Sequence, residues 1–167
     1  LLQSDISWQQ AYAVISSMAE LNRIILSKLF ESVDLQVGLF SSVAKFLTLE
    51  THPRVRCVVY NFIKKLSQKG ILNPVFESSA ILINPLRSLM FNDDFSVEIV
   101  GINQEASRFY IKTLAFDAFT QFITQLTTKK NIDYLVDLEP LKQELINRPE
   151  FTVQVIRVIG ELIKAAH

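Results

Sequence analysis

Residues 53–66 read PRVRCVVYNFIKKL, and this stretch decides the fold. Its apolar residues stand at positions i, i+4, i+7, i+8 and i+11, which share one face of an α-helix: Val55, Val59, Phe62, Ile63 and Leu66. Pro53 opens the stretch, in the first turn of a helix, where a missing N–H is harmless. The stretch therefore predicts an amphipathic helix that begins at Pro53.

The same template recurs elsewhere in the chain. From Pro149 onward the five apolar offsets are filled again, by Phe151, Val155, Val158, Ile159 and Leu162. A weaker copy begins at Trp8. The starts at residues 8, 53 and 149 lie 45 and 96 residues apart, so the second interval has room for one more helix, which we expect from Gln104 to about Thr128. A period of roughly 40 to 47 residues is typical of HEAT and armadillo repeats.

Apolar segments between these helices predict the partner helix of each repeat. They span residues 32–47, 74–91 and 132–146. Pro85 and Pro140 lie inside the second and third segments, which we expect to be kinked or broken there. Residues 95–100 have a brief extended pattern, but no stretch alternates polar and apolar residues for long. We therefore predict an all-α fold.

One pair of such helices cannot hide both of its apolar faces from water. At about 25 cal/mol per Å² of apolar surface, the exposed face favours the addition of a neighbouring pair. We predict a right-handed α-α superhelix of the HEAT/armadillo type, built from antiparallel helix pairs. The chain forms a single block, 1–167, of about four repeats within a longer solenoid, and the approximate units are 1–30, 31–70, 71–130 and 131–167.

Charge and cysteine content exclude several classes of partner. Seventeen basic residues balance seventeen acidic ones, so no long-range positive field attracts nucleic acid or anionic lipid. Polar residues interrupt every apolar run before the roughly 18 to 20 residues that span a bilayer. We expect neither direct nucleic-acid binding nor membrane insertion. A single cysteine, Cys57, and the absence of an Asn-x-Ser/Thr sequence favour the cytoplasm and nucleus.

The residues needed for catalysis are scarce. The two histidines are His52, beside a proline, and His167, so a Cys–His or Ser–His–acid arrangement has no support. Neither a glycine-rich phosphate loop nor a metal-ligand spacing occurs. We predict that the protein is not an enzyme and has no cofactor and no metal site.

The turn before the first quoted stretch resembles a known family. Thr51-His52-Pro53-Arg54-Val55-Arg56, followed by Asn61, is similar to the turn and helix of the importin-β (karyopherin-β) superfamily, and within it the importin-5 type. Leu1-Leu2-Gln3 and the helix that begins at Trp8 look like the preceding repeat. The resemblance covers about residues 1–70. It implies a nuclear transport receptor that binds cargo with a nuclear localisation signal, Ran-GTP and Phe-Gly nucleoporins.

Candidate contacts with protein partners lie on the polar sides of two predicted helices. They are Arg54, Arg56, Tyr60, Asn61, Lys64, Gln154 and Arg157. Asn61 is the strongest of them, because its amide suits an extended peptide backbone. For Arg56 we favour a structural role, with its planar fork bonded to an acidic group or backbone of the adjoining repeat, and Arg54 is expected to face solvent. For the other positions a solvated helix face is the default explanation.

A different class of HEAT scaffold is the alternative. Tubulin-binding domains of the TOG kind expose a tryptophan and basic residues along one edge, and Trp8, Arg54 and Lys129-Lys130 imitate that edge. Trp8 has a simpler interpretation, in which it covers the core of its own repeat. A phosphatase or kinase scaffold is a further possibility.

Overall fold

The computed structural model describes residues 6–72, 75–101, 106–125 and 138–166, and these are mostly helical. The described helices are α1 (Trp8–Glu20), α2 (Arg23–Leu29), α3 (Val33–Ala44), α4 (Pro53–Gln68), α5 (Phe76–Ser79), α6 (Ile83–Asn92), α7 (Ile111–Ile123), α8 (Leu138–Asn147) and α9 (Thr152–Ala166). The 3-10 turns Ala80–Leu82 and Pro149–Phe151 lead into α6 and α9. Strands β1 (Ser96–Val100) and β2 (Ala106–Tyr110) form an antiparallel hairpin between α6 and α7.

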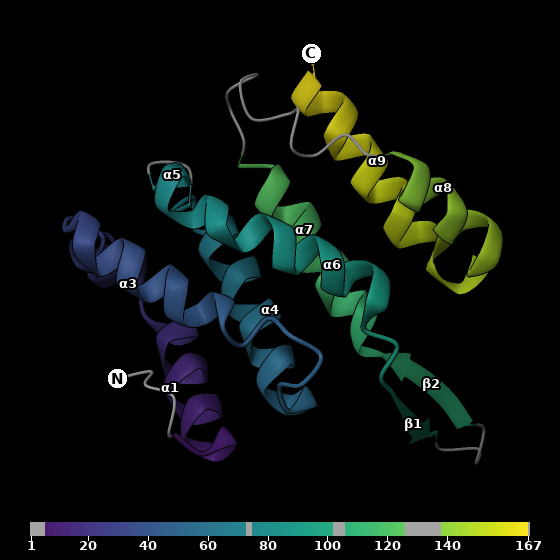
Figure 1. Cartoon of the computed structure of the whole chain (residues 1–167), viewed down its shortest axis with the longest axis horizontal. Helices are drawn as coiled ribbons and strands as arrows, with labels where there is room; N and C mark the ends of the chain where they lie inside the picture. The colour runs from purple at the N-terminus through teal and green to yellow at the C-terminus, as the bar shows by residue number, and fades with distance from the viewer. Residues whose placement is uncertain (1–5, 73–74, 102–105, 126–137, 167) are drawn as a thin grey trace.

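The helices form two layers that alternate along the chain. In the first layer α1 packs on α4, α4 on α7, and α7 on α9. The second layer contains α3, which packs on α5 and the turn before α6, and then α6 and α8, which cover α7 and α9. Figure 1 shows the helices succeeding one another across the molecule, from α1 near the N-terminus to α9 at the C-terminus. The described helices therefore form an elongated, two-layered arrangement whose buried side chains extend from α1 to α9.

Short polar residues start several helices where the sequence changes from loop to apolar period. Ser7 and Gln10 form a capping box, in which each side chain accepts a hydrogen bond from the backbone N–H of the other. Asn22 and Ser32 cap α2 and α3 in the simpler way. His52 caps α4 through Nδ1, which accepts from the Arg54 N–H at 3.3 Å. These caps satisfy N–H groups that have no partner inside the helix.

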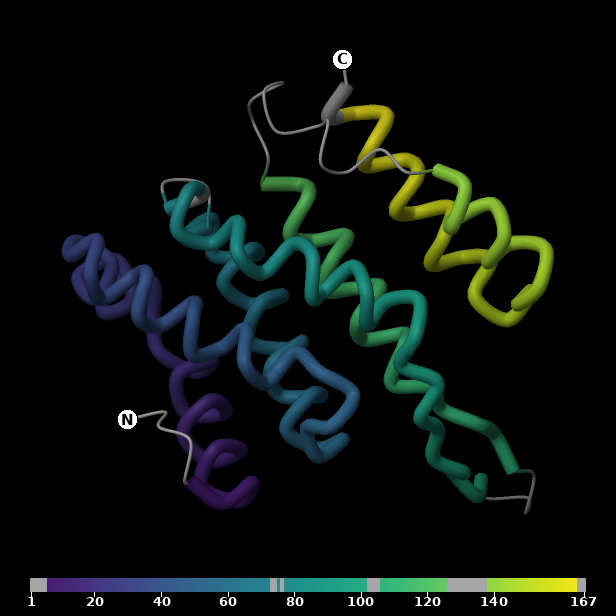
Figure 2. Tube along the Cα trace, in the orientation of Figure 1, coloured from purple at the N-terminus to yellow at the C-terminus, as the bar shows by residue number. Residues whose placement is uncertain are grey.

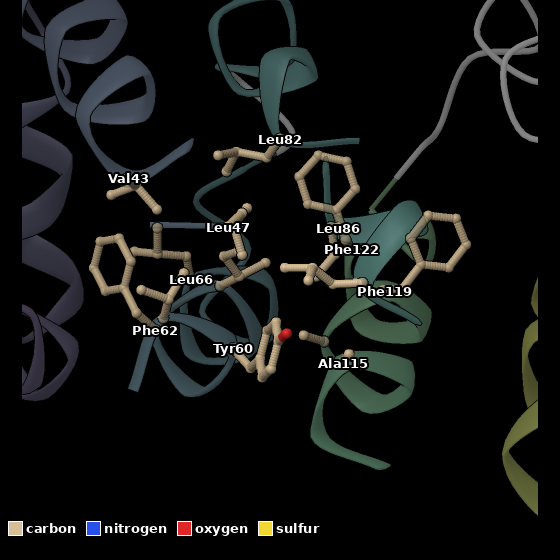
Figure 3. Packing of buried hydrophobic residues seen from close by; sticks show 14 of the residues in the cluster. Val43, Leu47, Tyr60, Phe62, Leu66, Leu82, Leu86, Ala115, Phe119 and Phe122 are labelled. Atoms are coloured by element: carbon tan, nitrogen blue, oxygen red, sulfur yellow. The ribbon is translucent and has the colours of Figure 1, made fainter. Parts of the chain in front are cut away.

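The quoted stretch forms the helix predicted for it, and its apolar stripe is buried. Val55, Val59, Phe62, Ile63 and Leu66 are all almost completely inaccessible to solvent. Figure 3 shows Phe62 and Leu66 of α4 in the layer of buried side chains that also holds Leu86 of α6 and Phe119 of α7. The second copy behaves alike, because Phe151, Val155, Val158 and Leu162 are buried and Ile159 is partly buried.

The two internal prolines do not kink their helices. Pro85 is the third residue of α6 and Pro140 the third of α8, so both lie in a first turn, where the helix needs no N–H. Residues 74–91 are nevertheless broken, because the 3-10 turn Ala80–Leu82 separates α5 from α6. The expected break is therefore present, in the turn that contains Ile81, the residue four positions before Pro85. Residues 132–137 of the third segment lie outside the described residues.

The hairpin corrects the expectation of a helix that starts at Gln104. Residues 106–110 are a strand, and α7 begins only at Ile111. The register pairs Val97 with Phe109 and Glu98 with Arg108. Figure 2 shows the chain leaving the end of α6, passing through the hairpin and returning directly into α7. The hairpin joins α6 of one layer to α7 of the other and projects beyond the ends of both helices, so the alternation of the layers continues across it (Figure 1).

Two glycines differ in what their backbone requires: Gly70 follows the end of a helix, and Gly160 lies inside one. Gly70 has a φ of 66° and follows the end of α4, where the Gly70 and Ile71 N–H groups bond back to Ser67 and Leu66. Gly160 lies inside α9, and a methyl group there would meet no atom within 4 Å. We expect Gly70→Ala to destabilise the protein by about 1 kcal/mol, because the left-handed conformation strains an alanine.

Gly160→Ala is the matched control and should stabilise the protein by about 0.5–1 kcal/mol, because alanine is the better helix former. Urea unfolding followed by circular dichroism measures both changes. Equal effects of the same sign at the two positions would contradict this interpretation of the backbone.

The two outermost parts of the array leave apolar side chains uncovered. At the N-terminal side the residues that share this exposure are Ile24, Ile25, Leu29, Val33, Leu35 and Val37, and in α9 they are Val153, Ile156 and Ile163. Val33, Leu35 and Val37 belong to the apolar segment 32–47, whose helix the structure contains as α3, but their side chains remain exposed. In the part of the chain that the structure describes, every helix is too short or too polar to cross a bilayer.

Candidate protein-binding site

Residues of α4, α7 and α9 form a charged ridge on one side of the first layer. Lys64 Nζ lies 3.2 Å from a carboxylate oxygen of Asp117, and Arg157 Nη1 lies 3.9 Å from the other oxygen. Asp117 thus joins a lysine from α4 to an arginine from α9. All three side chains remain partly exposed, so these pairs contribute little to stability. We call Asn61, Lys64, Asp117 and Arg157 the polar ridge.

The structure brings three of the predicted contact residues to this ridge. Asn61 and Arg157 are exposed and Lys64 is partly exposed. Gln154, on the same helix as Arg157, is partly buried, and its Oε1 atom makes no hydrogen bond within the described chain. Sequence analysis missed Asp117, because the prediction for that helix rested only on its apolar residues.

Arg54 and Trp8 meet at the edge between α1 and α4. The Trp8 indole stacks on the His52 ring, with centroids 4.1 Å apart and an interplanar angle of 4°. The Arg54 guanidinium carbon lies 5.9 Å from the Trp8 ring centroid, within the range of a cation–π interaction. Arg54 is exposed as expected, and Trp8 packs partly against the core. Lys129 and Lys130 lie outside the described residues.

Tyr60 and Arg56 are not available to a partner. Tyr60 is 1% exposed and appears among the buried side chains of Figure 3, so its assignment to a polar face is wrong. Its hydroxyl donates to Asp93 Oδ2 at 2.8 Å. Arg56 is 3% exposed and bonds to both carboxylate oxygens of Asp93, at 2.7 and 2.8 Å. It also donates to the Leu49 and Thr51 carbonyl oxygens. The favoured structural role of Arg56 is confirmed.

Asp93 and Asp94 connect the helices on their two sides. Asp93 is fully buried and faces back to Arg56 and Tyr60 of α4. Asp94 faces forward to Lys112 Nζ of α7, at 3.1 Å, and to Arg148, at 2.9 Å. Asp93 therefore connects the end of α6 to α4, and Asp94 connects it to α7 and to Arg148. Sequence analysis did not predict these partners.

Lys112 of α7 also connects α7 to α8. It is 1% exposed, and its Nζ atom lies 2.8 Å from Glu144 of α8. The same ammonium group lies 5.2 Å from the centroid of the Phe151 ring. An unpaired ammonium group would be costly at this depth, and the ion pairs with Glu144 and Asp94 offset that cost.

Ionisable groups beside these connections have shifted pKa values. Burial would lower the pKa of Arg56, but the hydrogen bond and charge of Asp93 outweigh it and raise that pKa. Burial and the negative charge of Asp93 raise the pKa of the Tyr60 hydroxyl. Burial, helped by Asp93, raises the pKa of the Cys57 thiol, which therefore stays protonated at neutral pH and is a poor nucleophile.

Asp94 should make stability depend on pH. Burial alone would raise its pKa, but hydrogen bonds and charges from Lys112 and Arg148 outweigh burial and lower it from the ordinary value of 3.8. A folded-state pKa below the unfolded one stabilises the protein above the unfolded value, and the gain is lost as pH falls through the folded pKa. We expect Asp94→Asn to lower the free energy of unfolding at neutral pH by at most about 1 kcal/mol, because solvent screens this half-exposed group.

The difference between Asp94→Asn and wild type should vanish at pH values well below 3.8. Urea unfolding of both proteins across acidic pH measures it. A constant difference at all pH values would show that the ionisation of Asp94 does not stabilise the fold.

No protein-family model, curated protein or solved structure matches this chain. Over the described ranges, His, Cys, Asp and Glu residues form no group of three or more that could hold a metal ion. The described candidate site thus consists of the polar ridge and of the Trp8, His52 and Arg54 side chains at the edge between α1 and α4.

Proposed function

We propose that this protein is a protein-binding scaffold of the HEAT type, a segment of an α-α superhelix that performs no reaction. The observation that carries this proposal is that helices successive along the chain alternate between two layers. One layer contains α1, α4, α7 and α9, and the other contains α3, α6 and α8. Such an array has one long exposed side for each layer, and extended surfaces of this kind bind other proteins.

The apolar side chains left exposed on α3 and α9 also support a superhelix. Val33 and Leu35 are 64% and 58% exposed, and Val153 and Ile156 are 57% and 58% exposed. A further helix pair at either side would remove such surface from water, at about 25 cal/mol per Å².

Within this class we favour an importin-β-like nuclear transport receptor, which binds cargo with a nuclear localisation signal, Ran-GTP and Phe-Gly nucleoporins in the cytoplasm and nucleus. Its basis is the resemblance of the Thr51–Arg56 turn and Asn61 to that superfamily. The burial of Arg56 and the exposure of Asn61 are compatible with a turn that supports the repeat and a helix that offers an amide to a partner.

A TOG-like tubulin binder is the second candidate. The observation in its favour is the contact of Arg54 with Trp8 at an edge formed by two successive repeats. The same edge exposes a cation beside an aromatic ring, as the tubulin-binding type requires.

Immobilised protein should separate the two candidates. It is incubated in parallel with Ran loaded with GTP, Ran loaded with GDP, and tubulin. Retention of the GTP form over the GDP form supports the transport receptor, and retention of tubulin alone supports the TOG-like scaffold. If none is retained, both candidates are rejected, and only a scaffold of another class, such as one for a phosphatase or kinase, remains.

A further inference from the structure

A pocket of about 490 Å³ lies between α1 and α4. The residues that line it are Trp8, Gln9, Tyr12, Arg54, Cys57, Val58 and Asn61. Its volume is within the range of pockets that bury a ligand or an amino-acid side chain. Asn61 also belongs to the polar ridge, so the pocket opens beside it.

The apolar walls of this pocket are held in place. The capping box of Ser7 and Gln10 fixes the start of α1 at Trp8, and the indole stacks on His52. Val58 is buried on its other side in the core, whereas Tyr12 is 41% exposed. A rigid aromatic wall loses little conformational entropy when it binds, which favours recognition of an apolar side chain.

The charge of the pocket is positive and comes from one residue. Arg54 is the single ionised group among the lining residues, and the first turn of α4 contains no acidic residue. Asp or Glu is absent from the lining. A cation beside an indole in a half-enclosed site attracts a carboxylate more strongly than an exposed lysine does.

The other basic residues of α4 are already paired. Arg56 bonds to Asp93, Lys64 to Asp117 and Lys65 to Glu20. Among the residues that the structure describes, Arg54 has no carboxylate partner, so it is the basic residue of this helix that remains open to an acidic group from outside.

We propose that this pocket binds an acidic linear segment of a partner protein. An apolar or aromatic side chain of the segment lies between Trp8, Tyr12 and Val58, and a neighbouring Asp or Glu carboxylate pairs with Arg54. The Asn61 amide bonds to the backbone of the segment. The proposal rests on the protein-binding function proposed above and specifies its chemistry, which is opposite in charge to a basic localisation signal.

Trp8 provides a direct measurement, because it is the one tryptophan of the chain. The probe is an acetylated and amidated peptide in which one phenylalanine is flanked by aspartates and glutamates. Its titration should change the emission of Trp8 with a Kd on the order of 10–1000 μM, as for a short segment in an open pocket. Two matched peptides, one with lysine at every acidic position and one with alanine for phenylalanine, should bind at least about tenfold more weakly.

Variants test the assignment of the two subsites. Arg54→Glu should weaken binding of the acidic peptide by at least about tenfold and should improve binding of the lysine peptide, because the charge of the pocket is reversed. Tyr12→Ala should weaken both phenylalanine-containing peptides. Lys142→Glu, at an exposed lysine of α8 outside the pocket and the polar ridge, is the control and should leave the affinity within about twofold.

Circular dichroism establishes that each variant is folded. Equal affinity for the acidic and lysine peptides, an unchanged affinity of Arg54→Glu, or no change in Trp8 emission at millimolar acidic peptide would overturn the proposal. Retention of Ran-GTP or tubulin by a protein that ignores the peptides would leave the proposed function standing and reject this pocket. Binding of the acidic peptide by a protein that retains neither Ran-GTP nor tubulin would support this pocket and reject those two partners.

Discussion

Asp93→Ala is expected to destabilise the protein by about 3–5 kcal/mol, which is much of the stability of a small domain. The substitution leaves the Arg56 guanidinium 3% exposed without its carboxylate and removes the acceptor of the Tyr60 hydroxyl. Breaking a buried ion pair by removing one partner is costly, because the remaining charge is neither paired nor hydrated. Urea unfolding at neutral pH, followed by circular dichroism, measures the loss.

Asp94→Ala is the matched control for this prediction. It removes the same atoms one residue later, but the Asp94 side chain is 58% exposed, so its loss should cost no more than about 1 kcal/mol. Arg56→Met combined with Asp93→Leu removes both charges and should recover part of the loss, since an apolar pair leaves no uncompensated charge. If Asp93→Ala and Asp94→Ala are equally mild, burial of the Arg56–Asp93 pair is not what stabilises this connection.

Lys112→Ala should have the second largest effect, a loss of about 3–5 kcal/mol. Its ammonium group is 1% exposed and bonds to Glu144 at 2.8 Å and to Asp94 at 3.1 Å. The substitution leaves the nearly buried Glu144 carboxylate without its cation and opens a cavity beside Phe151. Because these contacts join α7 to α8 and to the turn before α9, we also expect hydrogen exchange to accelerate in α8 and α9 before it does in α4.

Lys142→Ala provides the comparison within the same region. Lys142 is 67% exposed and pairs with Glu139 on the same helix, so its loss should change stability by less than about 0.5 kcal/mol. A similar cost for both lysines, or uniform exchange along the chain in Lys112→Ala, would show that Lys112 does not connect α7 to the C-terminal helices.

Local patterns were sufficient for the main helices. The template of Val55, Val59 and Phe62 predicted both the helix and its buried face, because helical period and apolar stripe are properties of neighbouring residues. The start of α4 at Pro53 followed from the same local rules. The exposure of Arg54 and the buried role expected for Arg56 were also correct.

Tyr60 shows where such patterns fail. On a helical wheel it lies off the apolar stripe, and only the packing of α4 against neighbours on more than one side buries it. The hairpin is a second case, since its brief extended pattern is too short to outweigh the helical interpretation of residues 104–128. The deciding contact for Tyr60 comes from Asp93, which is distant in the sequence, and for the hairpin from the facing strand.

By itself, the sequence determined that the chain forms amphipathic helices, where α1 and α4 begin, and which side of α4 and α9 carries the apolar stripe, because these depend on residues within one or two turns. Only the tertiary structure decided that Asp93 faces Arg56 while Asp94 faces Lys112, and that Arg54 lies beside Trp8 without a carboxylate partner among the described residues. Partners 37 residues apart, such as Arg56 and Asp93, have no local pattern to mark them. Ion pairing depends on distance and burial, and both are set by how the helices pack.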